Sequence, residues 1–233
     1  MRIDRGEYMK NACLAHHYPE ILGSYGGSQT WFADRNMRSG GCGVVAAGDL
    51  LLYLSMNRQG CRTEETHRIF QKDGSISKPR YGQYLKEMRK HYFPLLPRFG
   101  MPYWVLVVGL NRFFLKQDIR LKASWGVWPW NLEARIKKML LSDLPVILAV
   151  GPNFPFFFRK EKLDFYVKKE DGSYEKAART SAHYVVVTAC EGEYWKISSW
   201  GKAYWIRTEE YRQYTRKNRN YLMSNICYIQ ERK

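Results

Sequence analysis

A Gly-Gly-Cys-Gly segment at residues 40–43 runs directly into the long apolar stretch Val44–Leu54 and constrains the fold more than any other feature. The stretch is apolar on nearly every side of a helix, so we expect a helix that begins near Cys42 and lies buried in the centre of the protein. The first turn of a helix has unpaired N–H groups and the positive end of the helix dipole, which favour a thiolate. Cys42 therefore occupies a place that suits a nucleophile, although an inert buried cysteine would fit the same pattern.

Length and composition predict a single domain. The chain has 233 residues, of which 45% are hydrophobic and 15% aromatic, and no low-complexity break divides it. We expect an N-terminal extension over residues 1–25, a mainly helical lobe over 26–142 and a mainly β lobe over 143–233. The five cysteines include no CxxC pair, which favours free thiols over disulfides or a zinc knuckle.

The polar N-terminus and the charge bear on location and partners. Residues 1–20 contain no apolar signal-peptide region and no stretch reaches membrane-spanning length, so we expect a cytoplasmic protein without a membrane span. A net charge of +16 predicts attraction to an anionic partner, whether nucleic acid, anionic lipid or an acidic substrate. No nucleic-acid-binding motif accompanies this charge.

The sequence gives no support for a metal or another cofactor. His16 and His17 form an adjacent pair without further ligand spacing. No glycine-rich phosphate loop precedes a helix in a βαβ context. We therefore expect a reaction that uses the chain's own side chains.

Helices are expected mainly in the first part of the chain. Apolar residues at helical spacing predict helices over Arg80–Tyr92 and Leu132–Leu141, the second with Asn131 as its N-cap. The segment Tyr103–Phe114 fits either a strand that leads into a helix or one buried helix. Directly after the second helix, the apolar run Leu144–Gly151 predicts a buried strand.

Two β-hairpins are expected in the last part, around an Asp-Gly turn at residues 171–172 and around Gly192. The second hairpin begins at His183 and its second strand ends at Ser198–Trp200. Helices first and antiparallel sheet last is typical of the α+β class.

Folding about Gly192 brings the end of the second strand alongside His183, because antiparallel strands pair in opposite directions. Side chains alternate between faces, so one of Ser198 and Ser199 shares the face of His183, and a register shift of one residue exchanges them. Cys42, His183 and an orienting serine would form a nucleophile, base and orienter. His183 would take the Cys42 proton, or hold it in an imidazolium–thiolate pair, and return a proton to the leaving group.

These residues resemble the papain-like fold in its C39-like cysteine peptidase branch. The similarity lies in Ser39–Ala47, in Leu144–Val150 and in His183–Thr188, short segments that sample most of Gln29–Trp200. His183 follows Cys42 by roughly 140 residues, which is compatible with the order in papain. The resemblance implies a papain-like α+β fold, with a helical half whose central helix starts at the nucleophile and an antiparallel β half.

The resemblance also implies donors for a developing oxyanion. Gln29, in a Gln-x-Trp context, would donate to it together with the backbone N–H of Cys42. Asn36, six residues before the cysteine as in papain, is the alternative donor. Gly41 would line the substrate cleft.

The third catalytic position departs from the family. The segment Ser198-Ser199-Trp200-Gly201 is similar to the Asn-Ser-Trp-Gly of papain, with Ser198 in place of the usual Asn or Asp. A serine hydroxyl can accept a hydrogen bond from imidazole but brings no charge to stabilise an imidazolium. Trp200 would shield the hydrogen bond of the histidine.

The activity that the resemblance implies is hydrolysis of a peptide or amide bond through a thioester acyl-enzyme. An acyltransferase, in which an amine resolves the thioester, would use the same Cys-His site. A non-catalytic protein that uses the papain-like scaffold and its basic surface to bind an anionic partner is the hypothesis from another class, and it is motivated by Ser198 and the net charge of +16.

Overall fold

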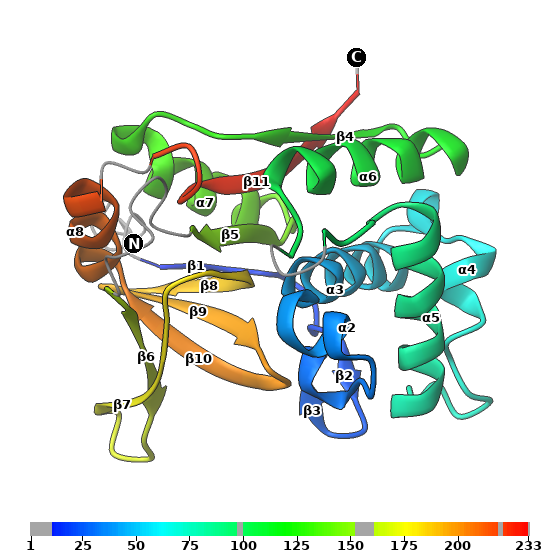
Figure 1. The fold of residues 1–233 in the computed structure, drawn as a ribbon, viewed down its shortest axis with the longest axis horizontal. Coiled ribbons are helices and arrows are strands. Elements are labelled where there is room, and N and C mark those ends of the chain that lie inside the picture. The colour runs from blue at the N-terminus through cyan, green and yellow to red at the C-terminus, as the bar shows by residue number, and fades with distance from the viewer. Residues whose placement is uncertain (1–10, 97–99, 152–160, 219–220, 233) are drawn as a thin grey trace, which may run out of the picture.

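One antiparallel sheet, with strands from both ends of the chain, forms the framework of the protein. The computed structural model describes residues 11–96, 100–151, 161–218 and 221–232 (Figure 1). The sheet has the order β4-β11-β5-β8-β9-β10-β6-β7, and β1 also pairs with β8. Its strands are β1 (Ala12–Cys13), β4 (Leu121–Trp125), β5 (Val146–Val150), β6 (Leu163–Lys168), β7 (Tyr174–Thr180), β8 (His183–Glu191), β9 (Tyr194–Ser199), β10 (Lys202–Arg207) and β11 (Ile226–Glu231). A separate small hairpin joins β2 (Glu20–Ile21) to β3 (Ser24–Tyr25).

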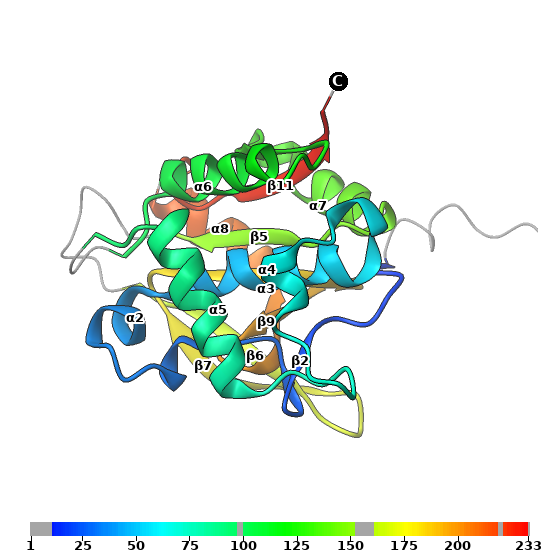
Figure 2. The ribbon, with the colours of Figure 1, turned by 90° about the vertical axis from the view of Figure 1, so that its right-hand side faces the viewer.

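The helices pack around this sheet, with α3 in the middle of the molecule between the sheet and α5 (Figures 1 and 2). The α-helices are α2 (Arg35–Gly40), α3 (Cys42–Asn57), α4 (Glu64–His67), α5 (Lys78–His91), α6 (Tyr103–Lys116), α7 (Leu132–Leu141) and α8 (Thr208–Asn218). Short 3-10 turns are η1 (Gln29–Trp31), η2 (Gln59–Cys61) and η3 (Pro129–Asn131). The predicted α+β class, with mixed helices and an antiparallel sheet, is confirmed.

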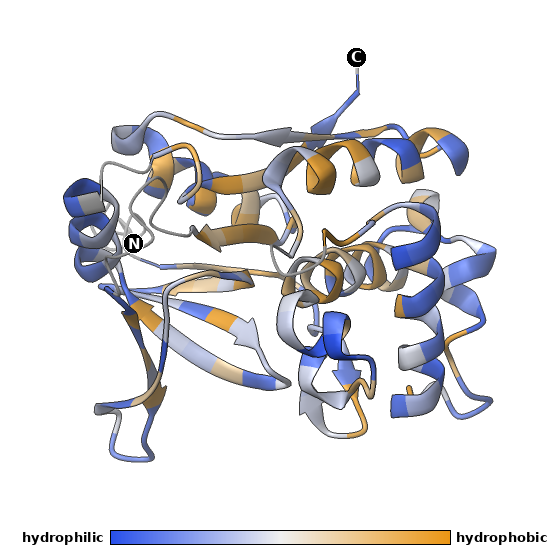
Figure 3. Ribbon diagram, in the orientation of Figure 1, coloured by the Kyte–Doolittle hydropathy of each residue, from blue (hydrophilic) through white to orange (hydrophobic). Residues whose placement is uncertain are grey.

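Burial explains why α3 is central. Every residue from Gly43 to Ser55 is buried, and Figure 3 shows apolar residues along α3 and the strands beside it. A Cβ atom at Gly48 would lie 2.3 Å from the Leu85 side chain of α5, and one at Gly43 would lie 2.4 Å from the Met101 side chain. The two glycines therefore let α3 approach α5 and the start of α6 closely.

Several predicted elements are confirmed. The expected helices correspond to α3, α5 and α7, the buried strand to β5, and the two hairpins to β6–β7 and β8–β9. The ambiguous segment is one helix, α6. Asn131 does hold the N-cap position of α7, but its side chain makes no capping hydrogen bond.

The edge of the sheet was not predicted. β11, near the C-terminus, pairs with both β4 and β5, and β4 precedes α7 in the chain. The sheet thus draws on residues from the region that was expected to be mainly helical. Such pairing joins segments far apart in the sequence, which local patterns do not record.

Within the described residues, no helix combines the length and the apolar composition that crossing a bilayer requires.

Candidate active site

Cys42 is the first residue of α3. Gly41 lies buried between α2 and α3 as the C-cap of one helix and the N-cap of the other. A Cβ atom there would lie 2.4 Å from the Met37 carbonyl oxygen, so the close junction of the two helices requires glycine. The junction fixes Cys42 at the N-terminal end of the central helix, where the residue is partly exposed but its thiol is desolvated.

Cys42 and His183 line the same small cavity. Its walls come from the Gly27–Gln29 segment, from α3, from β8 and from the end of β9. The cavity measures about 10 Å³, roughly the space of a single water molecule. The space that Cys42 and His183 share is therefore small.

His183 begins β8, opposite Val150 of β5, and its side chain is buried. The ring atom Nε2 lies 2.8 Å from Ser199 Oγ. The Trp200 ring stacks on the imidazole with a centroid distance of 4.5 Å and an interplanar angle of 21°. The hydrogen bond to Ser199, the pairing of β8 with β5 and the stacking of Trp200 together hold the imidazole in one orientation.

A β-bulge determines which serine meets His183. The pairing of β8 with β9 shifts by one residue between Val187 and Ala189. After the shift, Val186 pairs with Ser198. When this register is continued to His183, Ser199 lies on the same face as His183. Without the shift, Ser198 would lie on that face. Ser198 Oγ instead donates to the Tyr25 carbonyl at 3.0 Å. The structure thus brings Ser199 to the ring and does not bring Ser198 there.

Trp200 is held over His183 by a tight turn. Ser199 pairs with Lys202, and the two residues between them have positive φ angles, +50° at Trp200 and +73° at Gly201. A bulky residue with positive φ is strained, so the surroundings must hold it. Gly201 N–H donates to the Gly27 carbonyl at 2.9 Å, and Tyr25 N–H donates to the Gly201 carbonyl at 3.0 Å.

Gln29 lies in η1 and lines the cavity. Its Nε2 atom donates to the Arg38 carbonyl of α2 at 3.0 Å, which leaves the second amide hydrogen available. Asn36 lies on the exposed surface of α2, where its backbone N–H donates to Asp34 Oδ1 at 2.8 Å. The structure therefore brings Gln29, rather than Asn36, to the cavity.

Burial keeps both the thiol and the imidazole neutral. It raises the pKa of the Cys42 thiol, and the backbone N–H groups of Tyr184, Gly43 and Cys42 offset this only in part. It also lowers the pKa of His183 to about 3. The expectation that the helix N-terminus favours a thiolate is wrong for this structure, because desolvation outweighs the backbone donors. Among the described residues, no hydrogen bond joins Cys42 Sγ to the His183 ring.

Asp49 is a cavity-lining residue that the sequence reading missed. It is buried on α3, seven residues after Cys42 and so on the same face of the helix. Its carboxylate accepts from Tyr81 Oη at 2.5 Å, from Gly27 N–H at 2.9 Å and from Tyr18 Oη at 3.4 Å. Burial raises the pKa of the Asp49 carboxyl to about 6, although these three donors act to lower it. A carboxylate inside an apolar helix was the available signal.

Comparisons with known proteins complete the description. No protein-family model matches the chain, and no curated protein matches it. Among solved structures, the chain is similar to the crystal structure of a putative C39-like peptidase from Bacillus anthracis, with 15% sequence identity and a TM-score of 0.49. The superposition covers 95% of this chain and 99% of that one.

Proposed function

We propose that the protein is a cysteine peptidase or a related thiol amidohydrolase, with Cys42 as nucleophile and His183 as general base. The observation that carries the proposal is the cavity that Cys42 at the start of α3 shares with His183 at the start of β8. The imidazole is oriented by Ser199 and covered by Trp200. A nucleophile, a base and an orienting group in this order are the parts of a thiol hydrolase.

The first half-reaction follows from these positions. When Ser199 Oγ accepts from Nε2–H of His183, Nδ1 keeps its lone pair and takes the proton from Cys42 Sγ. The sulfur attacks the carbonyl carbon of the substrate, and the oxyanion accepts from the Cys42 backbone N–H and from Gln29 Nε2. The imidazolium then protonates the amine nitrogen. The tetrahedral intermediate collapses, the carbon–nitrogen bond breaks, and the acyl group stays on Cys42 as a thioester.

Water completes the cycle. His183 takes a proton from the water that attacks the thioester carbonyl, and the same two donors stabilise the second oxyanion. Collapse of this intermediate breaks the carbon–sulfur bond, releases the acid and returns the proton to Cys42 Sγ. The enzyme ends in its starting state, with a neutral thiol and a neutral imidazole.

A neutral resting state distinguishes this site from one with a stored ion pair. Burial disfavours both the thiolate and the imidazolium, and Ser199 adds no charge to stabilise them. From this neutral pair, the proposed reaction transfers the Cys42 proton to His183 as the sulfur attacks the substrate.

Acyl transfer to an amine is the second candidate. It would use the same Cys42 and His183, with an amine in place of water as the acceptor of the acyl group. A non-catalytic binding protein on the same scaffold remains the third candidate, and the uncharged orienting residue is the observation that favours it.

Incubation with a proteome-derived peptide mixture tests the proposal. The wild-type chain should create new peptide termini, and Cys42→Ala should create none. Cys13→Ala is the matched control, because Cys13 is an exposed thiol on β1 and its loss should leave the products unchanged. Added glycinamide should appear in the products of an acyltransferase and not in those of a hydrolase. Cleavage that survives in Cys42→Ala, or that is absent from the wild type, would contradict the proposal.

A further inference from the structure

Helix α6 exposes an apolar face to solvent. Trp104, Val108 and Leu115 are 56%, 60% and 58% exposed, and their spacing puts them on one side of the helix. The opposite side, which includes Leu106, Leu110 and Phe113, is buried in the core. A helix at the surface of a globular protein normally carries polar residues on its outer side, so this apolar face needs an explanation.

Two further tryptophans are exposed in the segment that follows β4. Trp128 and Trp130, at η3, are 68% and 73% exposed, and their rings stack with a centroid distance of 5.1 Å. Tyr103 at the start of α6 stacks on Trp125 at the end of β4, 5.0 Å between centroids, which joins α6 to the segment that leads to η3. We call Trp104, Val108, Leu115, Trp128 and Trp130 the α6–η3 face.

The edge strand beside this face is already paired. Asn111 of α6 donates from its amide to the Ala123 carbonyl and accepts from the Ala123 N–H, both at 2.9 Å. Figure 1 shows α6 and β4 side by side along one edge of the molecule. The side-chain amide thus occupies the backbone groups that a strand from another chain would use at this point, which disfavours β-strand addition as the role of the face.

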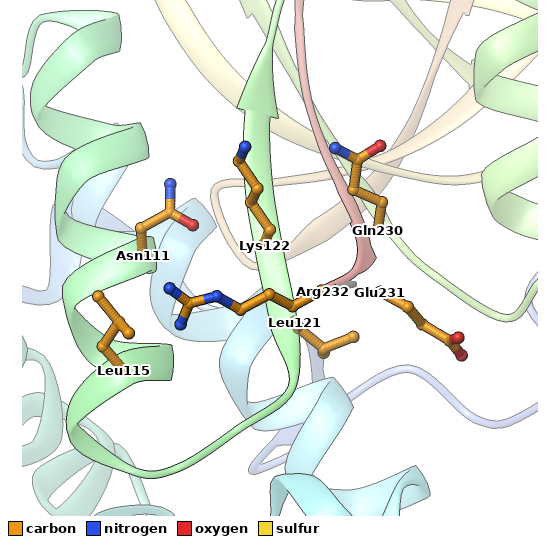
Figure 4. A pocket seen from close by; sticks show the side chains of 7 residues that line it. All are labelled: Asn111, Leu115, Leu121, Lys122, Gln230, Glu231 and Arg232. Carbon is orange, nitrogen blue, oxygen red and sulfur yellow. The ribbon is translucent and has the colours of Figure 1, made fainter.

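Cationic side chains surround the apolar ones. Arg112 and Lys116 are exposed on α6 beside Val108 and Leu115. Between α6 and the strands lies a groove of about 480 Å³, which contains Leu115, Lys122 and Arg232 (Figure 4). Figure 4 shows the Arg232 guanidinium on the α6 side of β4, whereas the carboxylate of Glu231 lies on the other side.

The sequence of this region also contains more basic than acidic residues. Residues 103–130 contain Arg112, Lys116, Arg120 and Lys122, and Asp118 is the single acidic residue. Tryptophan, aliphatic side chains and cations on one face are the composition that binds the interface of an anionic bilayer.

We propose that the α6–η3 face binds the surface of an anionic lipid membrane, with Trp104, Trp128 and Trp130 at the level of the headgroups. Exposed Val108 and Leu115 have no partner on a nucleic-acid backbone, which favours lipid over nucleic acid. A two-fold dimer through this face would bring two faces that carry Arg112 and Lys116 together, so like charges disfavour self-association. The inference does not depend on the chemistry of Cys42.

Vesicle co-sedimentation tests the proposal. The full chain should bind vesicles of phosphatidylcholine with about 30% phosphatidylserine, and should bind pure phosphatidylcholine more weakly. Trp128→Ala/Trp130→Ala should lower the partition coefficient by about tenfold, because both side chains leave the interface. Leu22→Ala is the apolar control, since Leu22 is 67% exposed at the turn between β2 and β3.

Matched charge variants separate a docking face from general attraction. Arg112→Gln/Lys116→Gln should lower binding by about tenfold or more, at about 1 kcal/mol per cation near the surface. Lys86→Gln/Lys90→Gln removes the same charge from exposed positions of α5 and should change binding by less than about twofold. All substituted side chains are exposed, and the contacts that they lose are the Trp128–Trp130 stacking and the Lys116–Tyr92 cation–π contact, so thermal unfolding should change little.

Three results would overturn the proposal. Equal losses in the α5 and α6 charge variants would mean that the net charge alone drives binding. Failure of the wild type to bind anionic vesicles at low salt would remove the membrane as partner. A dimer in sedimentation velocity that dissociates in Trp128→Ala/Trp130→Ala would assign the face to self-association.

Discussion

Helix α3 carries two buried ionisable groups on one face, and they differ in what surrounds them. Asp49 accepts hydrogen bonds from Tyr81, Gly27 and Tyr18. Cys42, seven residues earlier, lines the same cavity as Asp49 and His183, but among the described residues its thiol has only backbone N–H groups as donors. A buried polar group whose hydrogen bonds are all made inside the protein holds structure together, whereas one that keeps a free side toward a cavity is available for chemistry.

The hydrogen bonds of Asp49 also support the candidate active site beside it. Its carboxylate ties α3 to α5 through Tyr81 and to the backbone of Gly27, two residues before Gln29. Gly26 leaves no room for a side chain there, since a Cβ atom would lie 2.3 Å from Ser198 Oγ and 2.6 Å from Asp49 Oδ2. Asp49 is therefore a positioning residue for the Gly26–Gln29 segment and not a proposed participant in the reaction.

The largest effect should separate activity from stability. His183→Gln removes the base, so peptide hydrolysis should fall by at least about 10³-fold. Asp49→Ala leaves Tyr81 and the Gly27 N–H without their acceptor, so the free energy of unfolding should fall by about 2–3 kcal/mol. Hydrolysis per folded molecule should change less than tenfold in Asp49→Ala. Urea unfolding and peptide cleavage measured on both variants check this, and similar effects of both on cleavage would erase the distinction.

The pH dependence of stability should have opposite signs at the two groups. Burial raises the pKa of Asp49 to about 6, so its contribution to stability is fully present below about pH 4 and is lost as pH rises through 6. Burial lowers the pKa of His183 to about 3, so its contribution is present above its unfolded pKa of about 6.5 and is lost as pH falls through 3. Between about pH 4 and 6 the two slopes oppose each other.

Single variants should show the pH dependence of stability that each group contributes. Relative to wild type, Asp49→Asn should gain about 3 kcal/mol of unfolding free energy between about pH 4 and 6, because the penalty of ionising Asp49 disappears. His183→Asn should lose about as much relative to wild type over the same rise in pH. Urea unfolding at several pH values measures both differences. Parallel curves for wild type and either variant would show that the substituted group is not perturbed by burial.

The sequence predicted the elements that carry Cys42 and His183 because both lie beside strong local patterns. The apolar run after Cys42 marks α3, and the β-rich run after His183 marks β8. Local periodicity did not predict β4 and β11, whose pairing joins distant segments. It also could not predict the partners of Asp49, which come from three other places in the chain.

The serine that contacts His183 shows most clearly what could not be predicted from the sequence. The hairpin about Gly192 and the choice between Ser198 and Ser199 could be read from the sequence, but the bulge near Thr188 could not. A bulge adds one unpaired residue and exchanges the faces of all residues beyond it. The similarity of the Ser198–Gly201 segment to papain pointed to Ser198, while the register presents Ser199.

The smallest effect should distinguish these two serines. Ser199→Ala removes the hydrogen bond that orients His183, so kcat should fall by about tenfold while thermal stability changes little. Ser198→Ala removes a hydrogen bond to the Tyr25 carbonyl, so it should cost about 1 kcal/mol of stability and leave kcat nearly unchanged. The two variants delete the same atom from adjacent residues and thus control for each other. Ser199→Asn, which places an amide oxygen next to the imidazole, should retain part of the kcat that Ser199→Ala loses if orientation is the role of this residue. A larger loss of kcat in Ser198→Ala than in Ser199→Ala would place Ser198 at the ring in the working enzyme, and would mean that its β8–β9 register differs from the one described here.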